Sequence, residues 1–179
     1  MSTSLVLTVI GNDRPGLIES LSQTIADHDG SWMESRTARM AGKFAGVLRV
    51  RVPDAHVNAL TAALLAEESQ GLSIIAERAP SEEPTEPCRA LSLELIGQDR
   101  PGIVHEVALA LMRVRGNIDE MTTEVVDATM SGETLFQARA KLRVPAAVPI
   151  NELRDVLEQL ADELMVDITL NEGAPAAEG

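Results

Sequence analysis

The sequence predicts an α+β fold in which two similar units follow one another along a chain of 179 residues. First, the octapeptide Gly11-Asn-Asp-Arg-Pro-Gly-Leu-Ile18 returns as Gly97-Gln-Asp-Arg-Pro-Gly-Ile-Val104. Second, each copy follows a short apolar run and precedes apolar residues at helical spacing, which is typical of a strand-to-helix corner. Third, residues 79–88, rich in proline and glutamate, separate the copies. We therefore expect domains at 1–78 and 89–171, joined by a solvated linker.

The first unit shows the element order β-α-β-β-α-β. The apolar residues Leu17, Ile18, Leu21 and Ile25 recur at helical spacing, and Gly30 is placed to cap the end of that helix. The predicted elements are a strand at 4–10, a helix from 17 to about 29, strands at 31–40 and 44–52 around a tight turn at 41–43, a helix from 53 with a stripe of Val57, Leu60, Leu64 and Leu65, and a strand at 72–77.

The second unit repeats this order. Leu91, Leu93 and Leu95 alternate along its first strand, so one face of that strand is expected to be buried, and Gly116 corresponds to Gly30. The predicted elements are a strand at 90–96, a helix at 103–114, strands at 117–126 and 135–144 around a longer turn at 127–133, a helix from about 153 to 164, a strand at 166–170, and a disordered tail at 172–179. Each unit is thus expected to be ferredoxin-like, with a four-stranded antiparallel sheet and two helices on one face.

The repeated corner carries the chemistry of an anion-binding turn. Its glycines permit tight backbone turns, and Pro15 suits a first helical position. Asp13 and Asp99 are predicted to cap the helices that follow, by accepting hydrogen bonds from free backbone N–H groups. The N–H groups and the positive end of the helix dipole favour a carboxylate or another small anion.

Charge and composition exclude several function classes. The net charge of −13 argues against direct nucleic-acid binding, which needs clustered Lys and Arg. The same element order occurs in RNA-recognition modules, but the only aromatic residues are Trp32, Phe44 and Phe136, too few for a base-stacking platform. Any role in gene control would therefore need a protein partner. No signal peptide or membrane-span pattern is seen, and with the single Cys88 this leads us to expect a cytoplasmic protein.

No catalytic or metal-binding pattern emerges. His28, His56 and His105 are scattered, and Cys88 has no histidine near it in sequence. We therefore expect a non-enzymatic protein without a metal or cofactor. Five cations share strand parity and form either a basic stripe or, as the acidic composition favours, a solvated sheet face or subunit interface: Arg49, Arg51, Arg139, Lys141 and Arg143.

These residues resemble a known family. A strand, then Asp-Arg-Pro-Gly opening a helix, then His28-Asp-Gly-Ser-Trp32 or Arg115-Gly-Asn-Ile118 before the second strand, resembles the ACT domain, a small regulatory module that binds amino acids. A tandem pair without an attached enzyme is similar to the glycine cleavage system transcriptional repressor group. The corner also resembles the N-terminal ACT domain of formyltetrahydrofolate deformylase, but from the two units alone we expect no catalytic domain.

The resemblance implies where a ligand would bind. In ACT domains the effector lies between the first strand–helix loop and an adjoining unit, commonly at the start of the second strand. The implied residues are Asn12, Asp13, Gly16, Leu17, Ser31 and Trp32 in one unit, and Gln98, Asp99, Gly102, Ile103, Asn117 and Ile118 in the other. The two sites differ, since Ser31 stands where the other unit has Asn117, so one can bind ligand while the other is structural. For Trp32, a packing role at the corner is favoured over a role as a ligand platform.

The resemblance also implies a function. We expect a non-enzymatic regulator that binds a small amino acid, glycine being the family's suggestion, between units that pair within the chain or in a homo-oligomer. Binding would change the surface shown to a DNA-binding transcription factor. The alternatives are a deformylase-related regulatory fragment and a pure protein-interaction module.

Overall fold

The computed structural model describes residues 1–67, 71–80, 86–127 and 134–172. The chain divides into two compact units, residues 1–82 and 83–179. Of the predicted linker, residues 81–85 lie outside the described part, and β5 begins at Cys88, the last linker position. The predicted tail also lies outside it, except for Glu172, and so does the longer turn, except for Asp127.

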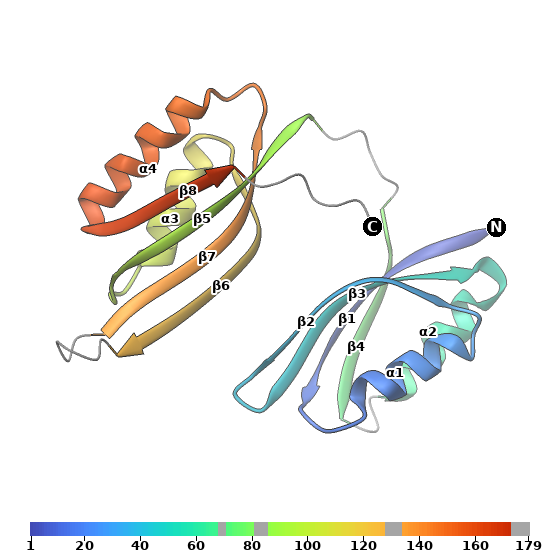
Figure 1. Cartoon of the computed structure of the whole chain (residues 1–179). Coiled ribbons are helices and arrows are strands. Elements are labelled where there is room, and N and C mark those ends of the chain that lie inside the picture. Colours follow the sequence, from blue (N-terminus) through green and yellow to red (C-terminus); the bar gives the residue numbers. More distant parts are fainter. Residues whose placement is uncertain (68–70, 81–85, 128–133, 173–179) are drawn as a thin grey trace. The chain divides into compact units, whose positions relative to one another are not determined.

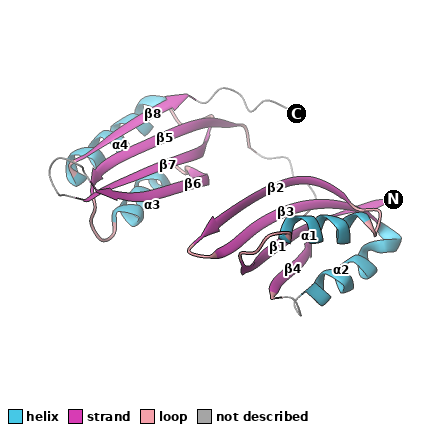
Figure 2. Cartoon of the chain, turned by 60° about the horizontal axis from the view of Figure 1, so that its bottom comes forward, coloured by secondary structure: helices cyan, strands magenta, loops and turns pink. Residues whose placement is uncertain are grey.

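The first unit has the predicted βαββαβ order (Figure 1). Its elements are β1 (Ser2–Asn12), α1 (Leu17–Ala26), β2 (Ser31–Met40), β3 (Lys43–Pro53), a short 3-10 turn η1 (Asp54–His56), α2 (Val57–Ala66) and β4 (Leu72–Arg78). The strands form an antiparallel sheet in the order β2-β3-β1-β4. Both helices lie on the same face of that sheet (Figure 2).

The second unit repeats the topology. Its elements are β5 (Cys88–Gln98), α3 (Ile103–Arg113), β6 (Asn117–Asp127), β7 (Thr134–Pro145), α4 (Ile150–Leu164) and β8 (Val166–Glu172). The sheet order is β6-β7-β5-β8, again antiparallel throughout, with α3 and α4 on one face (Figure 2). The predicted fold class is therefore confirmed for both halves.

Each unit buries its own core between sheet and helices. The predicted inward residues of β5, Leu91, Leu93 and Leu95, are at most 2% exposed. The predicted inward residues of β3 are likewise buried: Phe44, Leu48, Val50 and Val52. The buried residues of the two units form two separate clusters. Each unit thus has the buried core that an independent domain needs.

The helical stripes are narrower than predicted. The predicted stripes include Ile18 and Leu65, but these residues are 50% and 48% exposed. In α1 only Leu17, Leu21 and Ile25 are buried, every fourth residue. Consecutive residues on a helix lie about 100° apart, so the neighbour of a buried residue turns away from the sheet.

The glycines that follow α1 and α3 have a different role from the predicted one. The left-handed position belongs to Asp29 (φ 55°) and Arg115 (φ 53°), not to the glycines. Gly30 donates its N–H to the carbonyl of Ile25 (2.9 Å), and Gly116 makes the equivalent bond. These hydrogen bonds, which span six residues, are those of a Schellman helix end. Glycine commonly holds the left-handed position of that motif, but here it is the next residue.

Both units carry a β-bulge at the same place. Trp32 pairs with Val50 and Glu34 with Arg49, so Met33 has no cross-strand partner. In the second unit Asp119 is the unpaired residue, because Ile118 pairs with Leu142 and Glu120 with Lys141. The extra residue shifts the alternation of inward and outward side chains by one position along the edge strand.

Candidate functional site

The repeated corner ends at a left-handed glycine in each unit. Gly16 (φ 85°) and Gly102 (φ 89°) are the N-cap residues of α1 and α3, and neither helix has a side-chain cap. The prediction that Asp13 and Asp99 cap these helices is therefore wrong. The Pro-Gly turn lies between each aspartate and its helix, so Pro15 also precedes the helix rather than opening it.

Asp13 instead ties the corner to the β2–β3 hairpin. Its carboxylate pairs with the Arg39 guanidinium (2.7 Å), and its backbone N–H donates to the carbonyl of Gly42 (2.9 Å). Asn12 accepts a hydrogen bond from the Lys43 ammonium (2.6 Å). In the second unit the Asp99 N–H donates to the carbonyl of Thr134 (3.1 Å), so the same backbone tether is repeated.

The start of each helix is suited to an anion. The first intrahelical bonds run from Ser20 to Gly16 and from Glu106 to Gly102 (2.9 and 3.0 Å), so the N–H groups before them have no acceptor within the helix. The predicted site residues Leu17 and Ile103 are each only 4% exposed, because their side chains belong to the cores. They can offer a ligand their backbone N–H groups but not their side chains.

The strand starts lie far from the corner of their own unit. Ser31 is opposite Arg51 on β3, whereas Asn12 is opposite Lys43, eight residues earlier. At about 3.3 Å per residue, the corner residue Asn12 and the strand start Ser31 are therefore about 26 Å apart along the sheet. Asn117 and Gln98 are separated in the same way along β7. The twelve predicted residues are therefore not brought together within a unit, and a site using both groups would need two units.

Trp32 and Ile118, the second residues of these strands, are half-buried and pack against the core of their own unit. The packing role to which Trp32 is suited is thus present.

The sequence did not predict a polar cluster that lies at the start of β6. The Arg143 Nε–H lies 2.8 Å from both carboxylate oxygens of Asp119, and the Asn117 amide nitrogen donates to Asp119 Oδ1 (3.0 Å). Asp119 was missed because it occupies the bulge, which periodicity does not reveal. Pairing Asn117 with Arg143 across the hairpin would have been the signal to follow.

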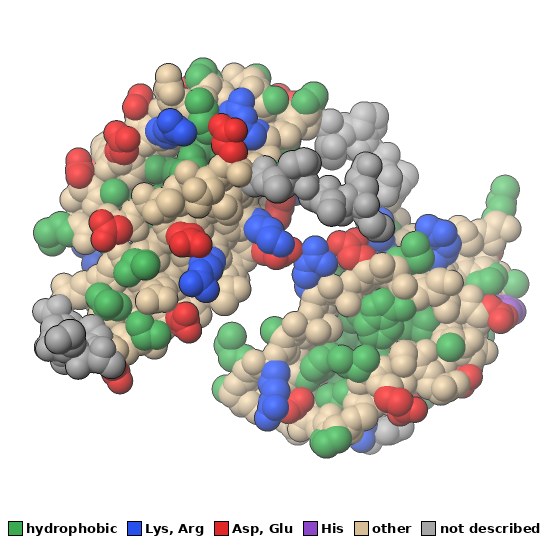
Figure 3. Space-filling view, viewed as in Figure 1, with side chains coloured by type: hydrophobic (Ala, Val, Ile, Leu, Met, Phe, Trp, Pro, Cys, Tyr) green, Lys and Arg blue, Asp and Glu red, His purple; other side chains and the backbone are tan. Residues whose placement is uncertain are grey.

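The five outward cations do not form a continuous basic stripe. Four pair with acidic side chains, at distances of 2.8 to 3.8 Å: Arg49 with Glu34, Arg139 with Glu94, Lys141 with Glu120, and Arg143 with Asp119. On the described residues visible in Figure 3, basic side chains are scattered among acidic and apolar ones and form no continuous band. This pairing agrees with the favoured expectation, a solvated sheet face or a subunit interface, rather than with a basic stripe.

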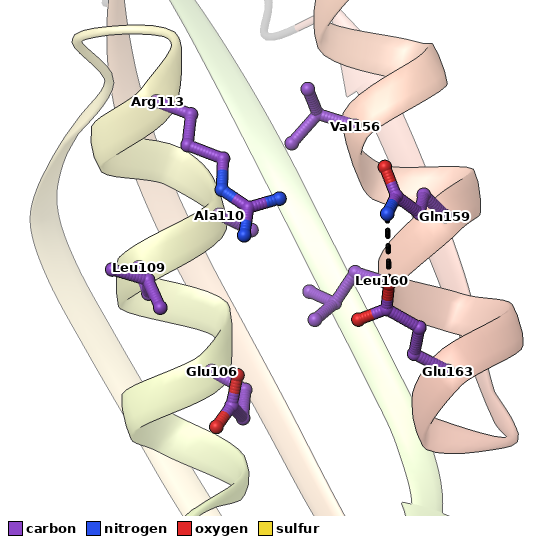
Figure 4. Close-up of a pocket in the computed structure, with 8 residues that line it drawn as sticks. All are labelled: Glu106, Leu109, Ala110, Arg113, Val156, Gln159, Leu160 and Glu163. Atoms are coloured by element: carbon purple, nitrogen blue, oxygen red, sulfur yellow. Dashed lines mark hydrogen bonds between the residues drawn. The ribbon is translucent and has the colours of Figure 1, made fainter.

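Two pockets in the described part of the chain lie away from the corners. A pocket between α3 and α4 has a volume of about 10 Å³, with a Gln159–Glu163 hydrogen bond (2.8 Å) on its wall (Figure 4). That volume suits a single water molecule. A groove of about 290 Å³ between α4 and β8 is larger but contains none of the predicted residues. The described residues hold no cluster of three or more potential metal ligands and no helix long and apolar enough to cross a membrane.

Two βαββαβ units with a glycine-opened corner define a tandem of small α+β modules. Residues 3–76 match the family model of the ACT domain. The first unit is therefore an ACT domain, and the chain has a tandem ACT-like fold.

Solved structures share this fold over nearly the whole chain. An unknown protein from Galdieria sulphuraria is 29% identical, with a TM-score of 0.82, and the match covers 97% of this chain and 100% of that one. A protein proposed to be a glycine cleavage system transcriptional repressor is 16% identical, with a TM-score of 0.70 and coverage of 96% and 97%. No curated protein matches the sequence.

Proposed function

We propose that this chain is a non-enzymatic regulator that binds a small amino acid and acts on transcription through a DNA-binding protein partner. The observation that carries the proposal is the repeated corner, where two helices begin at a left-handed glycine without a side-chain cap. Each corner offers backbone N–H donors at the positive end of a helix dipole, which suits the carboxylate of an amino acid. Glycine is the first candidate, because the chain shares its fold with a protein proposed to be a glycine cleavage repressor.

The ligand would bind between units. Within a unit the corner and the strand start are about 26 Å apart, too far for one small molecule to touch both. In our proposal the corner of one unit faces the strand start of another, either in the same chain or in a homo-oligomer. A ligand that fits only the paired arrangement shifts the population toward it, and so changes the surface offered to a partner.

The charge distribution supports a protein partner rather than DNA. The chain carries a net charge of −13, and four of its outward sheet cations are already paired with acids. Strong phosphate binding requires unpaired, clustered cations. Such a regulator would work in the cytoplasm beside its partner.

Isothermal titration of the full chain with glycine, L-serine, L-alanine and a wider amino-acid panel tests the proposal, with light scattering to follow oligomeric state. We expect one amino acid to bind, with a stoichiometry of one or two per chain, and the Asn117→Ala variant to bind it more weakly. Ser31→Ala is the matched control for Asn117→Ala. Absence of binding at millimolar concentrations would refute the sensor function and favour a pure protein-interaction module.

A further inference from the structure

The polar cluster at the start of β6 fixes the direction of one amide. The Asp119 carboxylate is held by the Arg143 guanidinium, at 2.8 Å from Nε to each oxygen. Charge-assisted bonds of this kind are the stronger class of hydrogen bond in proteins. The two side chains are exposed to solvent, at 33% for Asp119 and 49% for Arg143, and it is the contact of one Nε with both carboxylate oxygens that places the pair beside Asn117.

A carboxylate paired with a guanidinium can only accept hydrogen bonds. The Asn117 amide must therefore direct its NH₂ group toward Asp119, as the 3.0 Å contact shows. Its carbonyl oxygen then faces away from the carboxylate and remains an acceptor. An acceptor fixed in this way recognises a donor, such as an ammonium group, and disfavours a carboxylate.

This polarity complements that of the corners. The corners present N–H donors, which suit the carboxylate end of an amino acid. The start of β6 presents an acceptor, which suits the ammonium end. The carboxylate and the ammonium group of one amino acid can thus be bound by N–H donors at a corner and by a carbonyl acceptor at the start of β6.

The first unit has different residues at the positions of Asn117 and Asp119. Ser31 occupies the position of Asn117, and Met33 occupies the bulge position of Asp119, with its side chain 42% exposed. Arg51 is retained opposite Ser31, but no carboxylate stands between them in the bulge. A serine hydroxyl can donate or accept, so it does not select one end of the ligand.

We infer that Asp119, held by Arg143, is a positioning residue that turns the Asn117 carbonyl oxygen toward the ammonium group of the ligand, and that the first unit has no equivalent. This inference rests on the proposed function, because it assigns roles within the same amino-acid site. It makes the start of β6 the ammonium-selective half of that site.

The test compares amino acids with their α-hydroxy analogues, in which a hydroxyl replaces the ammonium group. Glycine with glycolate, and L-alanine with L-lactate, are titrated into the full chain and into its Asp119→Asn variant. The amide that replaces the carboxylate can present either a donor or an acceptor, so the Asn117 amide becomes free to reverse. We expect the affinity for the amino acid to fall about tenfold, while that for the hydroxy acid changes less than about twofold.

Two controls separate positioning from a general structural effect. Met33→Asn makes the matched substitution in the first unit and is expected to leave both affinities unchanged. In an Asn117→Ala background, Asp119→Asn is expected to add nothing, because its effect passes through Asn117. The Asn117 side-chain amide resonances should also shift in the ligand-free Asp119→Asn protein.

The outcomes are distinguishable. If the unsubstituted chain binds none of the amino acids, the proposed function and this inference both fail. If it binds an amino acid but Asp119→Asn weakens amino and hydroxy acids equally, or Met33→Asn acts as Asp119→Asn does, only the positioning role is refuted.

Discussion

Gly16 and Gly102 occupy a position at which the chain must turn left-handed before it can enter a helix. No heavy atom beyond their chain neighbours lies within 4 Å of a Cβ added at either residue, so there is space for a side chain. The requirement is therefore conformational rather than steric. It also explains why glycine stands at this position in both copies of the motif.

Gly16→Ala is predicted to destabilise the first unit by about 1 to 2 kcal/mol, the cost of a left-handed alanine. Chemical denaturation followed by circular dichroism measures the change. Gly16→Asn is the matched control and should cost less, because asparagine tolerates this conformation. Equal losses for both variants would point to an unseen clash instead.

At the level of single residues, the sequence could locate the corner but not assign the roles of its side chains. The motif predicted where the helix begins to within a residue. It gave Asp13 the role of a cap, whereas the carboxylate pairs with Arg39, a residue on the far side of a hairpin. A pairing between residues distant in sequence depends on which strands are neighbours and on their register, and the motif around Asp13 contains neither.

At the level of the elements, the end of α1 brings the backbone of Gly30 so close to Ile25 that a side chain at residue 30 has no space. A Cβ added at Gly30 would lie 2.7 Å from Ile25 Cγ2 and 2.8 Å from the Ile25 carbonyl oxygen. At Gly116 the nearest atom, the Leu111 carbonyl oxygen, would be 3.2 Å away. The two helix ends share one hydrogen-bond pattern but differ in the space around the glycine.

Gly30→Ala is accordingly predicted to destabilise the chain by about 2 kcal/mol, as expected for overpacking against backbone. Gly116→Ala should cost clearly less, because its neighbours need to yield by only a few tenths of an ångström. Thermal denaturation of the two variants in parallel decides the matter, and a larger loss at Gly116 would contradict the explanation.

The β2–β3 hairpin closes through a two-residue turn with positive φ at both positions, 48° at Ala41 and 77° at Gly42. A turn of this kind favours Asn-Gly over Ala-Gly. Ala41→Asn is therefore predicted to stabilise the first unit by about 0.5 to 1 kcal/mol, measured by urea denaturation. Ala41→Val, which is β-branched and poorly suited to positive φ, should have the opposite effect.

In the molecule as a whole, two separate cores predict two separable unfolding units. Leu7 and Leu93 are equivalent core residues, each at most 1% exposed. Leu7→Ala and Leu93→Ala should each cost about 2 to 5 kcal/mol. If the units unfold independently, each substitution shifts one calorimetric transition and leaves the other in place, whereas a single transition shifted equally by both would show coupling between the units.

The element order and fold class were predictable because alternating strands, helical stripes and a repeated motif all agree. The strand at 31–40 and the inward faces of β3 and β5 were predicted correctly. The candidate site could be predicted from the sequence only in part. Its two groups of residues were named, but neither the distance between them nor the Asp119 bulge follows from the spacing of residues in one chain.

The paired bulges also carry a record of the molecule's history. An insertion at the same point in both units is most simply explained as inherited from one ancestral module that existed before duplication. The bulged residue faces no partner across the ladder, so a substitution there disturbs strand pairing least. After duplication that position could diverge at little cost, and the contrast between Met33 and Asp119 is the kind of difference by which two identical halves acquire distinct roles.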